Sequence, residues 1–338
     1  MKSLSELAVG IVIVGVMALT NAHISAAQQQ GAPGNLAGGG PASWPTGKAP
    51  EPPALDTTPY KRKWLDLSYA NLSEKQKLDI YLPAEGNGPF PVVCYVHGGG
   101  WGVSDKASME LENTLKEGMK RGWAVVSINY RYSSEAHFPA QIMDVKAAIR
   151  WLRANGAKYQ LRTEKIGVWG SSSGGHLVAL LGTSGGVEKL EGLNLGNAKE
   201  SSRVQAVIDV SGPIDFLKMD SELEQDGFTN FAKHADARGP ESNLLGKPIE
   251  SVPELAKEAN PETYIRGDAP PFLLEYGAKD NSVSVHQAIL FAQKLEAAIG
   301  KDKVNLVIFP EGGHGGGDAA STDENMNRIF SFLDRYVR

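Results

Sequence analysis

From about residue 60 to its end, the chain alternates short apolar runs with longer amphipathic stretches. The first two runs, 65–69 and 78–82, alternate apolar and polar residues, which is typical of half-exposed antiparallel strands. Six later runs are apolar almost throughout, which indicates strands buried on both faces of a parallel sheet. These runs are 92–96, 124–128, 166–169, 204–210, 272–276 and 304–309.

Helical patterns lie between these runs. In the clearest one, 140–154, the residues Ile142, Val145, Ile149 and Leu152 recur at spacings of three and four. Further helices are predicted near 104–121, 173–182, 285–298 and 323–338. This alternation predicts an α/β fold with a mostly parallel sheet of eight strands, helices on both faces and the antiparallel pair at one edge.

One segment, about 216–264, breaks the alternation because it is long, charged and interrupted by glycine and proline. Loops of this length are uncommon unless they serve a function. We predict a cap-like insertion beside the carboxyl ends of the strands, where open α/β sheets bind ligands.

The N-terminal segment predicts export. Lys2 precedes an unbroken apolar run of 12 residues, 8–19, and small residues then lead to Ala27. We therefore expect residues 1–27 to be a signal peptide cleaved after Ala27, and the protein to be secreted or periplasmic, without stable membrane insertion after cleavage. The alternative, a membrane anchor, needs about 18 or more apolar residues.

After the predicted leader, residues 28–59 are rich in glycine, proline and glutamine and hold few large apolar side chains, which predicts a flexible linker. The folded domain is then expected at 60–338.

Because the 34 basic and 39 acidic residues give a net charge of −5, with no basic run, a nucleic-acid partner is not expected. A single cysteine, Cys94, excludes an intrachain disulfide and a cysteine-based zinc site. The sequence gives no indication of oligomeric state.

The sequence Gly170-Ser-Ser-Ser-Gly174 lies directly between a predicted strand and a predicted helix. A nucleophile on such a sharp turn needs small residues two positions before and after it, which selects Ser172. Ser173 is an alternative nucleophile, since small Ser171 stands two positions before it. A serine- and glycine-rich loop without chemistry is the simpler interpretation, but the strand before it and the helix after it favour the nucleophile.

A second motif, His97-Gly-Gly-Gly-Trp101, directly follows the third predicted strand. Hydrolysis of an acyl compound through a tetrahedral intermediate needs fixed N–H donors for an oxyanion. The amides of Gly99, Gly100 and Ser173 are the expected donors. We expect His97 to hold the loop by hydrogen bonds and Trp101 to pack in the core, and both are also candidates for the wall of a substrate pocket.

A base and its orienting acid are expected later in the chain, in the order serine, acid, histidine. Asp280 and His314 each follow one of the last two predicted strands, so both should reach the sheet edge that carries Ser172. Otherwise, Asp280 would cap the next helix and His314 would be a surface residue. Asp209 and Asp215, which follow another strand, are alternative acids.

Together with KLDIYLP (77–83), NYRY (129–132), the helix at 144–155 and EGGHG (311–315), these motifs resemble a known family over about residues 60 to 337. The chain resembles secreted bacterial α/β-hydrolase esterases, specifically the bifunctional carbohydrate acetyl esterase and feruloyl esterase (BD-FAE-like) family. That family is similar to hormone-sensitive-lipase-like esterases and to kynurenine formamidase. The resemblance implies an α/β-hydrolase catalytic domain with Ser172, Asp280 and His314 as the triad. Two positions depart from it: Ser173 stands where relatives often have alanine, and Glu275-Tyr-Gly where they commonly have His-Gly.

We therefore expect a serine carboxylesterase that works through an acyl-enzyme, with no metal or organic cofactor. The resemblance and the predicted export point to acetyl or feruloyl esters of carbohydrates, and small soluble esters fit equally well. One alternative is an amidase, peptidase or formamidase-like hydrolase. The other is a non-catalytic binding protein of the same fold, which predicts the loss of a triad residue, whereas all three candidates are present.

Overall fold

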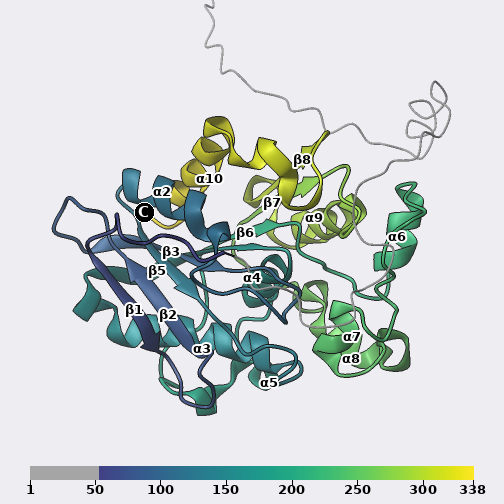
Figure 1. Cartoon of the computed structure of the whole chain (residues 1–338), viewed down its shortest axis with the longest axis horizontal. Helices are drawn as coiled ribbons and strands as arrows, with labels where there is room; N and C mark the ends of the chain where they lie inside the picture. The colour runs from purple at the N-terminus through teal and green to yellow at the C-terminus, as the bar shows by residue number, and fades with distance from the viewer. Residues whose placement is uncertain (1–52) are drawn as a thin grey trace, which may run out of the picture. The chain divides into compact units, whose positions relative to one another are not determined.

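The computed structural model describes residues 53–338, which contain one eight-stranded sheet (Figure 1). Its strand order is β1-β2-β4-β3-β5-β6-β7-β8. Strand β2 runs antiparallel to both β1 and β4, and all other neighbours are parallel. The strands are β1 (Lys63–Ser68), β2 (Lys77–Tyr81), β3 (Phe90–Val96), β4 (Ala124–Ile128), β5 (Leu161–Ser171), β6 (Ala206–Val210), β7 (Phe272–Gly277) and β8 (Val304–Phe309). The predicted eight strands and the antiparallel pair at one edge are confirmed, and the fold is that of the α/β-hydrolases.

Burial on both faces explains the continuous apolar runs. In β3, Val92, Cys94 and Val96 belong to the core on one face of the sheet. The intervening Val93 and Tyr95 belong to the core on the other face. Since successive side chains of a strand point to opposite faces, a central strand must be apolar at every position.

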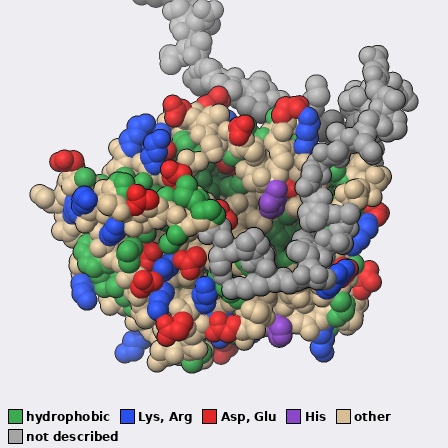
Figure 2. Space-filling view, in the orientation of Figure 1, with side chains coloured by type: hydrophobic (Ala, Val, Ile, Leu, Met, Phe, Trp, Pro, Cys, Tyr) green, Lys and Arg blue, Asp and Glu red, His purple; other side chains and the backbone are tan. Residues whose placement is uncertain are grey.

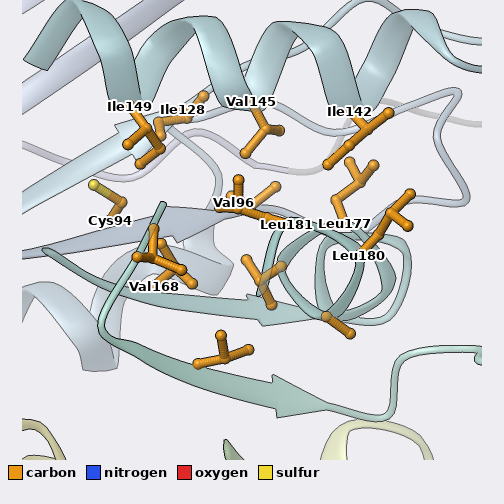
Figure 3. Packing of buried hydrophobic residues seen from close by; sticks show 14 of the residues in the cluster. Cys94, Val96, Ile128, Ile142, Val145, Ile149, Val168, Leu177, Leu180 and Leu181 are labelled. Carbon is orange, nitrogen blue, oxygen red and sulfur yellow. The ribbon is translucent and has the colours of Figure 1, made fainter. Parts of the chain in front are cut away.

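Helices cover both faces of the sheet. Helices α3 (Ala140–Asn155), α4 (Ser173–Thr183) and α9 (Val285–Ile299) contribute to the first core. Helices α2 (Glu112–Lys120) and α10 (Asp323–Tyr336) contribute to the second. In Figure 3, Ile142, Val145 and Ile149 of α3 point toward the strands, as their spacing predicts. Truncating such a fully buried side chain to alanine costs about 2–5 kcal/mol.

The predicted insertion is folded into short helices (Figure 1). It contains α6 (Met219–Gln225), α7 (Pro240–Leu245), α8 (Pro253–Ala259) and the 3-10 turns η4 (Ile249–Ser251) and η5 (Pro261–Tyr264). The other short elements are α5 (Glu188–Glu191), η1 (Met109–Leu111), η2 (Gly156–Tyr159), η3 (Leu193–Leu195), η6 (Lys301–Lys303) and η7 (His314–Ser321). Within residues 53–338, no helix combines the length and the apolarity needed to span a membrane.

The packed domain begins earlier than the predicted boundary at residue 60. Ala54 forms an antiparallel bridge with Ser108, and the Leu55 amide donates to the carbonyl of Ala107 at 2.7 Å. Leu55 is buried in the second core. The glycine- and proline-rich composition around Leu55 does not reveal that this side chain packs there. The predicted signal peptide and the linker up to residue 52 lie outside the described residues.

The helix predicted at 104–121 begins only at Met109, as η1 followed by α2. The preceding residues are held in another way. The Lys106 amide donates to the Asn129 side chain at 2.5 Å, and the Lys106 ammonium lies 3.3 Å from Asp79. These contacts fix the chain in turns there, which the apolar spacing does not predict.

Candidate active site

Ser172 occupies the sharp turn between β5 and α4. Its φ of 55° and ψ of −123° are uncommon for a residue with a side chain. A Cβ atom on Gly170 would lie 2.2 Å from the carbonyl oxygen of Gly174, and one on Gly174 would lie 2.0 Å from that of Val96. The turn therefore requires glycine two positions before and two positions after Ser172, as the motif predicts.

Ser173, the alternative nucleophile, points away from the site. Its side chain is buried, and its Oγ lies 3.3 Å from the Tyr130 hydroxyl. Ser173 is the first residue of α4, so its hydroxyl is part of the packing beneath the turn. The structure therefore favours Ser172 as the nucleophile.

The structure brings together the three side chains predicted to form a triad. His314 Nε2 lies 2.9 Å from Ser172 Oγ, and His314 Nδ1 lies 2.8 Å from Asp280 Oδ2. The other Asp280 oxygen accepts the amides of Ser282 and Val283, at 2.8 and 2.9 Å. Asp280 is fully buried, whereas the His314 side chain is 35% exposed. The acid is thus fixed by the backbone, and the imidazole reaches the surface where a substrate can approach.

Two opposing effects set the pKa of His314. Desolvation favours the neutral ring and lowers the pKa, but the charge and hydrogen bond of Asp280 outweigh it. The net result is a pKa above the ordinary 6.5. The imidazolium that forms when a base accepts a proton is therefore stabilised at this position.

The glycine loop after β3 has a backbone conformation that favours glycine. Gly99 and Gly100 have φ values of 98° and 57°, and a Cβ on Gly99 would lie 2.4 Å from the Val103 carbonyl oxygen. The Gly98 amide donates to a carboxylate, but within residues 53–338 the amides of Gly99, Gly100 and Ser173 donate to no protein acceptor. These three donors are thus available to a ligand.

His97 and Trp101 are both buried. His97 Nδ1 lies 2.8 Å from the Gly98 carbonyl oxygen, and its ring stacks on Tyr130 at 4.6 Å, which confirms that it holds the loop. Trp101 packs edge-on against His176, at 5.1 Å, and against a phenylalanine of the insertion. The expectation that Trp101 packs in the core is confirmed, because it belongs to the first core. That either side chain also lines a substrate pocket stays a prediction.

The alternative acids have other partners. Asp209 is fully buried and accepts the Tyr276 hydroxyl and the Gly212 amide, both at 2.9 Å. Burial raises its pKa to about 7. Asp215 pairs with Lys218 at 2.9 Å. Asp280 is therefore the acid that the structure places against the imidazole.

The insertion is bound to the turn that carries the acid. His234 Nδ1 lies 2.8 Å from Glu241, and both side chains are buried. His234 also forms a hydrogen bond with the backbone of Ser282 in the Asp280 turn. Desolvation lowers the pKa of His234, but the charge of Glu241 outweighs it, so the net shift is upward. Sequence reasoning missed this contact because no periodic pattern marks it.

Two other contacts near the site also lie outside the sequence motifs. Ser211, at the end of β6, accepts the amide of Gly315 at 3.1 Å and so holds the loop that follows His314. Pro240 of the insertion would lie 3.1 Å from a Cβ on Gly100.

On the face shown in Figure 2, a hollow lined by hydrophobic side chains has a histidine beside it. Among the described residues, no three His, Cys, Asp or Glu side chains are grouped so that they could hold a metal ion.

Comparisons with known proteins find esterases among the proteins that are similar to this chain. LipC, an esterase of Mycobacterium tuberculosis, is 31% identical over 269 residues, which are 78% of this chain and 63% of LipC. The bifunctional GH43-CE protein of Bacteroides eggerthii is 37% identical with a TM-score of 0.72, covering 81% of this chain and 35% of that one. A truncated carbohydrate esterase from gut microbiota is 32% identical with a TM-score of 0.75, covering 84% and 99%.

These similarities differ in how far they extend. The chain spans less than two thirds of LipC and about a third of the bifunctional protein, so their activities do not transfer as a whole. The BD-FAE family model matches residues 78–295, which is more than half of the chain and includes Ser172 and Asp280. The chain therefore belongs to the BD-FAE family.

Proposed function

We propose that the protein is a serine carboxylesterase with Ser172, His314 and Asp280 as its catalytic triad. The observation that carries this proposal is the continuous path of 2.9 and 2.8 Å contacts from the Ser172 hydroxyl through His314 to Asp280. Ser172 Oγ attacks the ester carbonyl while His314 Nε2 accepts its proton. Asp280 holds the Nδ1–H tautomer and stabilises the imidazolium.

The amides of Gly99, Gly100 and Ser173 then bind the oxyanion of the tetrahedral intermediate. Collapse of this intermediate releases the alcohol, which takes the proton from His314, and leaves the acyl group on Ser172. Water cleaves the acyl-enzyme through the same proton relay. Removal of one such oxyanion donor typically costs about 10²–10³-fold in kcat.

Carbohydrate acetyl or feruloyl esters are the proposed substrate class. Membership of the BD-FAE family supports it, as does similarity to a solved carbohydrate esterase and to a bifunctional GH43-CE protein. Export through the predicted signal peptide would bring the enzyme to such substrates. Small soluble esters are the alternative that the same triad would hydrolyse.

Hydrolysis of a substrate panel tests the proposal. p-Nitrophenyl acetate, acetylated xylan and methyl ferulate are compared for wild type, Ser172→Ala and the control Ser331→Ala, a residue exposed on α10. We expect Ser172→Ala to lose about 10³-fold or more of kcat on every ester that wild type hydrolyses. Unchanged turnover in Ser172→Ala would overturn the triad, and faster cleavage of a matched anilide than of its ester would indicate an amidase.

A further inference from the structure

A carboxylate that no sequence motif marks lies beside the proposed nucleophile. Glu110, in η1, accepts the Gly98 amide at 2.9 Å. It also forms a hydrogen bond with Tyr95. Burial, the charge of Glu110 and this bond together raise the pKa of the Tyr95 hydroxyl. Two donors from β3 and its loop therefore hold the Glu110 side chain at a fixed place, although Glu110 itself is exposed.

The distance from this carboxylate to the nucleophile is short. A Cβ built on Gly98 would lie 3.3 Å from Glu110 Oε2 and 3.3 Å from Ser172 Cβ. The two atoms are therefore no farther apart than twice that distance. The charge of Glu110 also acts on His314 and contributes to its raised pKa. Glu110 is thus close enough to act electrostatically on a group bound at Ser172.

The charge of Glu110 is not neutralised by the surrounding protein. Among residues 53–338, no Lys, Arg or His forms an ion pair with it. Its neighbours Gly98 and Tyr95 are neutral donors, which solvate a carboxylate without cancelling its charge. A substrate next to Ser172 therefore meets a fixed negative charge and an acceptor-only group.

We propose that Glu110 is a specificity-determining residue that makes the site prefer uncharged, hydroxyl-bearing or cationic esters over esters that carry a carboxylate near the scissile bond. The proposal rests on the proposed esterase function and narrows its substrates to neutral rather than acidic carbohydrate esters. Sugar hydroxyls donate to a carboxylate, whereas a second carboxylate at this range is repelled.

A matched pair of acetate esters tests the charge preference. 4-Acetoxybenzoate is anionic and 4-acetoxybenzamide is neutral, and both transfer the same acetyl group. The readout is the ratio of kcat/KM for the anionic ester to that for the neutral ester. Glu110→Gln keeps an oxygen that can accept the Gly98 amide but removes the charge. Glu85→Gln makes the same change at an exposed residue and serves as the control. Glu85 lies in the loop before the amino end of β3, whereas Ser172 lies at the carboxyl end of β5.

We expect Glu110→Gln to raise this ratio by about 3- to 10-fold, and Glu85→Gln to leave it unchanged. Raising the salt concentration should raise the ratio of the wild-type enzyme toward that of Glu110→Gln, because mobile ions screen an exposed charge. This salt series needs no variant, so a wild-type ratio that salt does not change refutes the role of Glu110 even if Glu110→Gln does not fold.

An equal ratio in wild type and Glu110→Gln, or a wild-type ratio that salt does not change, overturns the role of Glu110. If instead the proposed esterase function is wrong, even the neutral ester should show no turnover that depends on Ser172. Hydrolysis that depends on Ser172, with a ratio that does not respond to Glu110→Gln or to salt, refutes only the charge preference.

Discussion

The buried carboxyl of Glu275 should make the protein less stable as the pH rises. Glu275 lies in β7 with 1% of its surface exposed, and only one of its oxygens has a partner, the Asn325 amide at 2.9 Å. Burial raises its pKa from the ordinary 4.5 to about 7. The folded state therefore holds a proton that the unfolded state releases at lower pH.

The sign and size of this effect follow from the two pKa values. Because the folded pKa is the higher one, the contribution of Glu275 to stability is fully present below about pH 4.5 and is lost as the pH rises through about 7. At 1.36 kcal/mol for each pKa unit, the loss is about 3 kcal/mol. Glu275→Gln cannot ionise but keeps an oxygen that accepts from Asn325, so its stability should lack this slope.

Urea denaturation of wild type and Glu275→Gln at pH 5, 6, 7 and 8 measures the effect. The free energy of unfolding of the variant relative to wild type should rise by about 2–3 kcal/mol between pH 5 and pH 8. Glu85→Gln, which changes an exposed carboxylate, serves as the control. A difference between Glu275→Gln and wild type that does not depend on pH would refute the raised pKa.

Two further predictions concern the triad and the turn beneath it. Asp280→Asn removes the charge that stabilises protonated His314, so kcat should fall by about 10⁴-fold. The acid limb of the pH–rate profile lies above pH 6.5 in wild type and should move to lower pH in the variant. An acid limb at the same pH in both proteins would contradict this. Gly174→Ala places a Cβ 2.0 Å from the Val96 carbonyl oxygen and should cost about 3 kcal/mol or more, or prevent folding, as measured by thermal unfolding. Gly267→Ala, whose Cβ would have its nearest neighbour at 3.6 Å, is the matched control, and equal melting temperatures would show that the turn tolerates a side chain.

The parts of the fold that the sequence predicts well are those that local patterns determine. Central strands are apolar at every position because both faces are covered, and the stripe of α3 follows from helical spacing. The Gly170–Gly174 motif is equally local, because its glycines are required by contacts of 2.0–2.2 Å within the turn and with β3. Such features depend mainly on neighbours that the motif and strand order already imply.

Features that depend on distant contacts are the ones that the sequence does not reveal. Glu110 has no motif, and its position matters only because the loop at Gly98 folds onto it. The His234–Glu241 pair depends on how the insertion packs on the Asp280 turn. Leu55 lies in a segment of linker-like composition and is buried because the second core has room for it.

Covalent labelling of the full-length protein with a fluorophosphonate, followed by peptide mapping, tests most directly whether Ser172 is an activated nucleophile. The hydrogen bond between Ser172 and His314 predicts one modified serine, residue 172, and labelling that declines as the pH falls through the pKa of His314. Modification of Ser173 or of any other serine, or labelling that persists in Ser172→Ala, would show that the nucleophile is elsewhere.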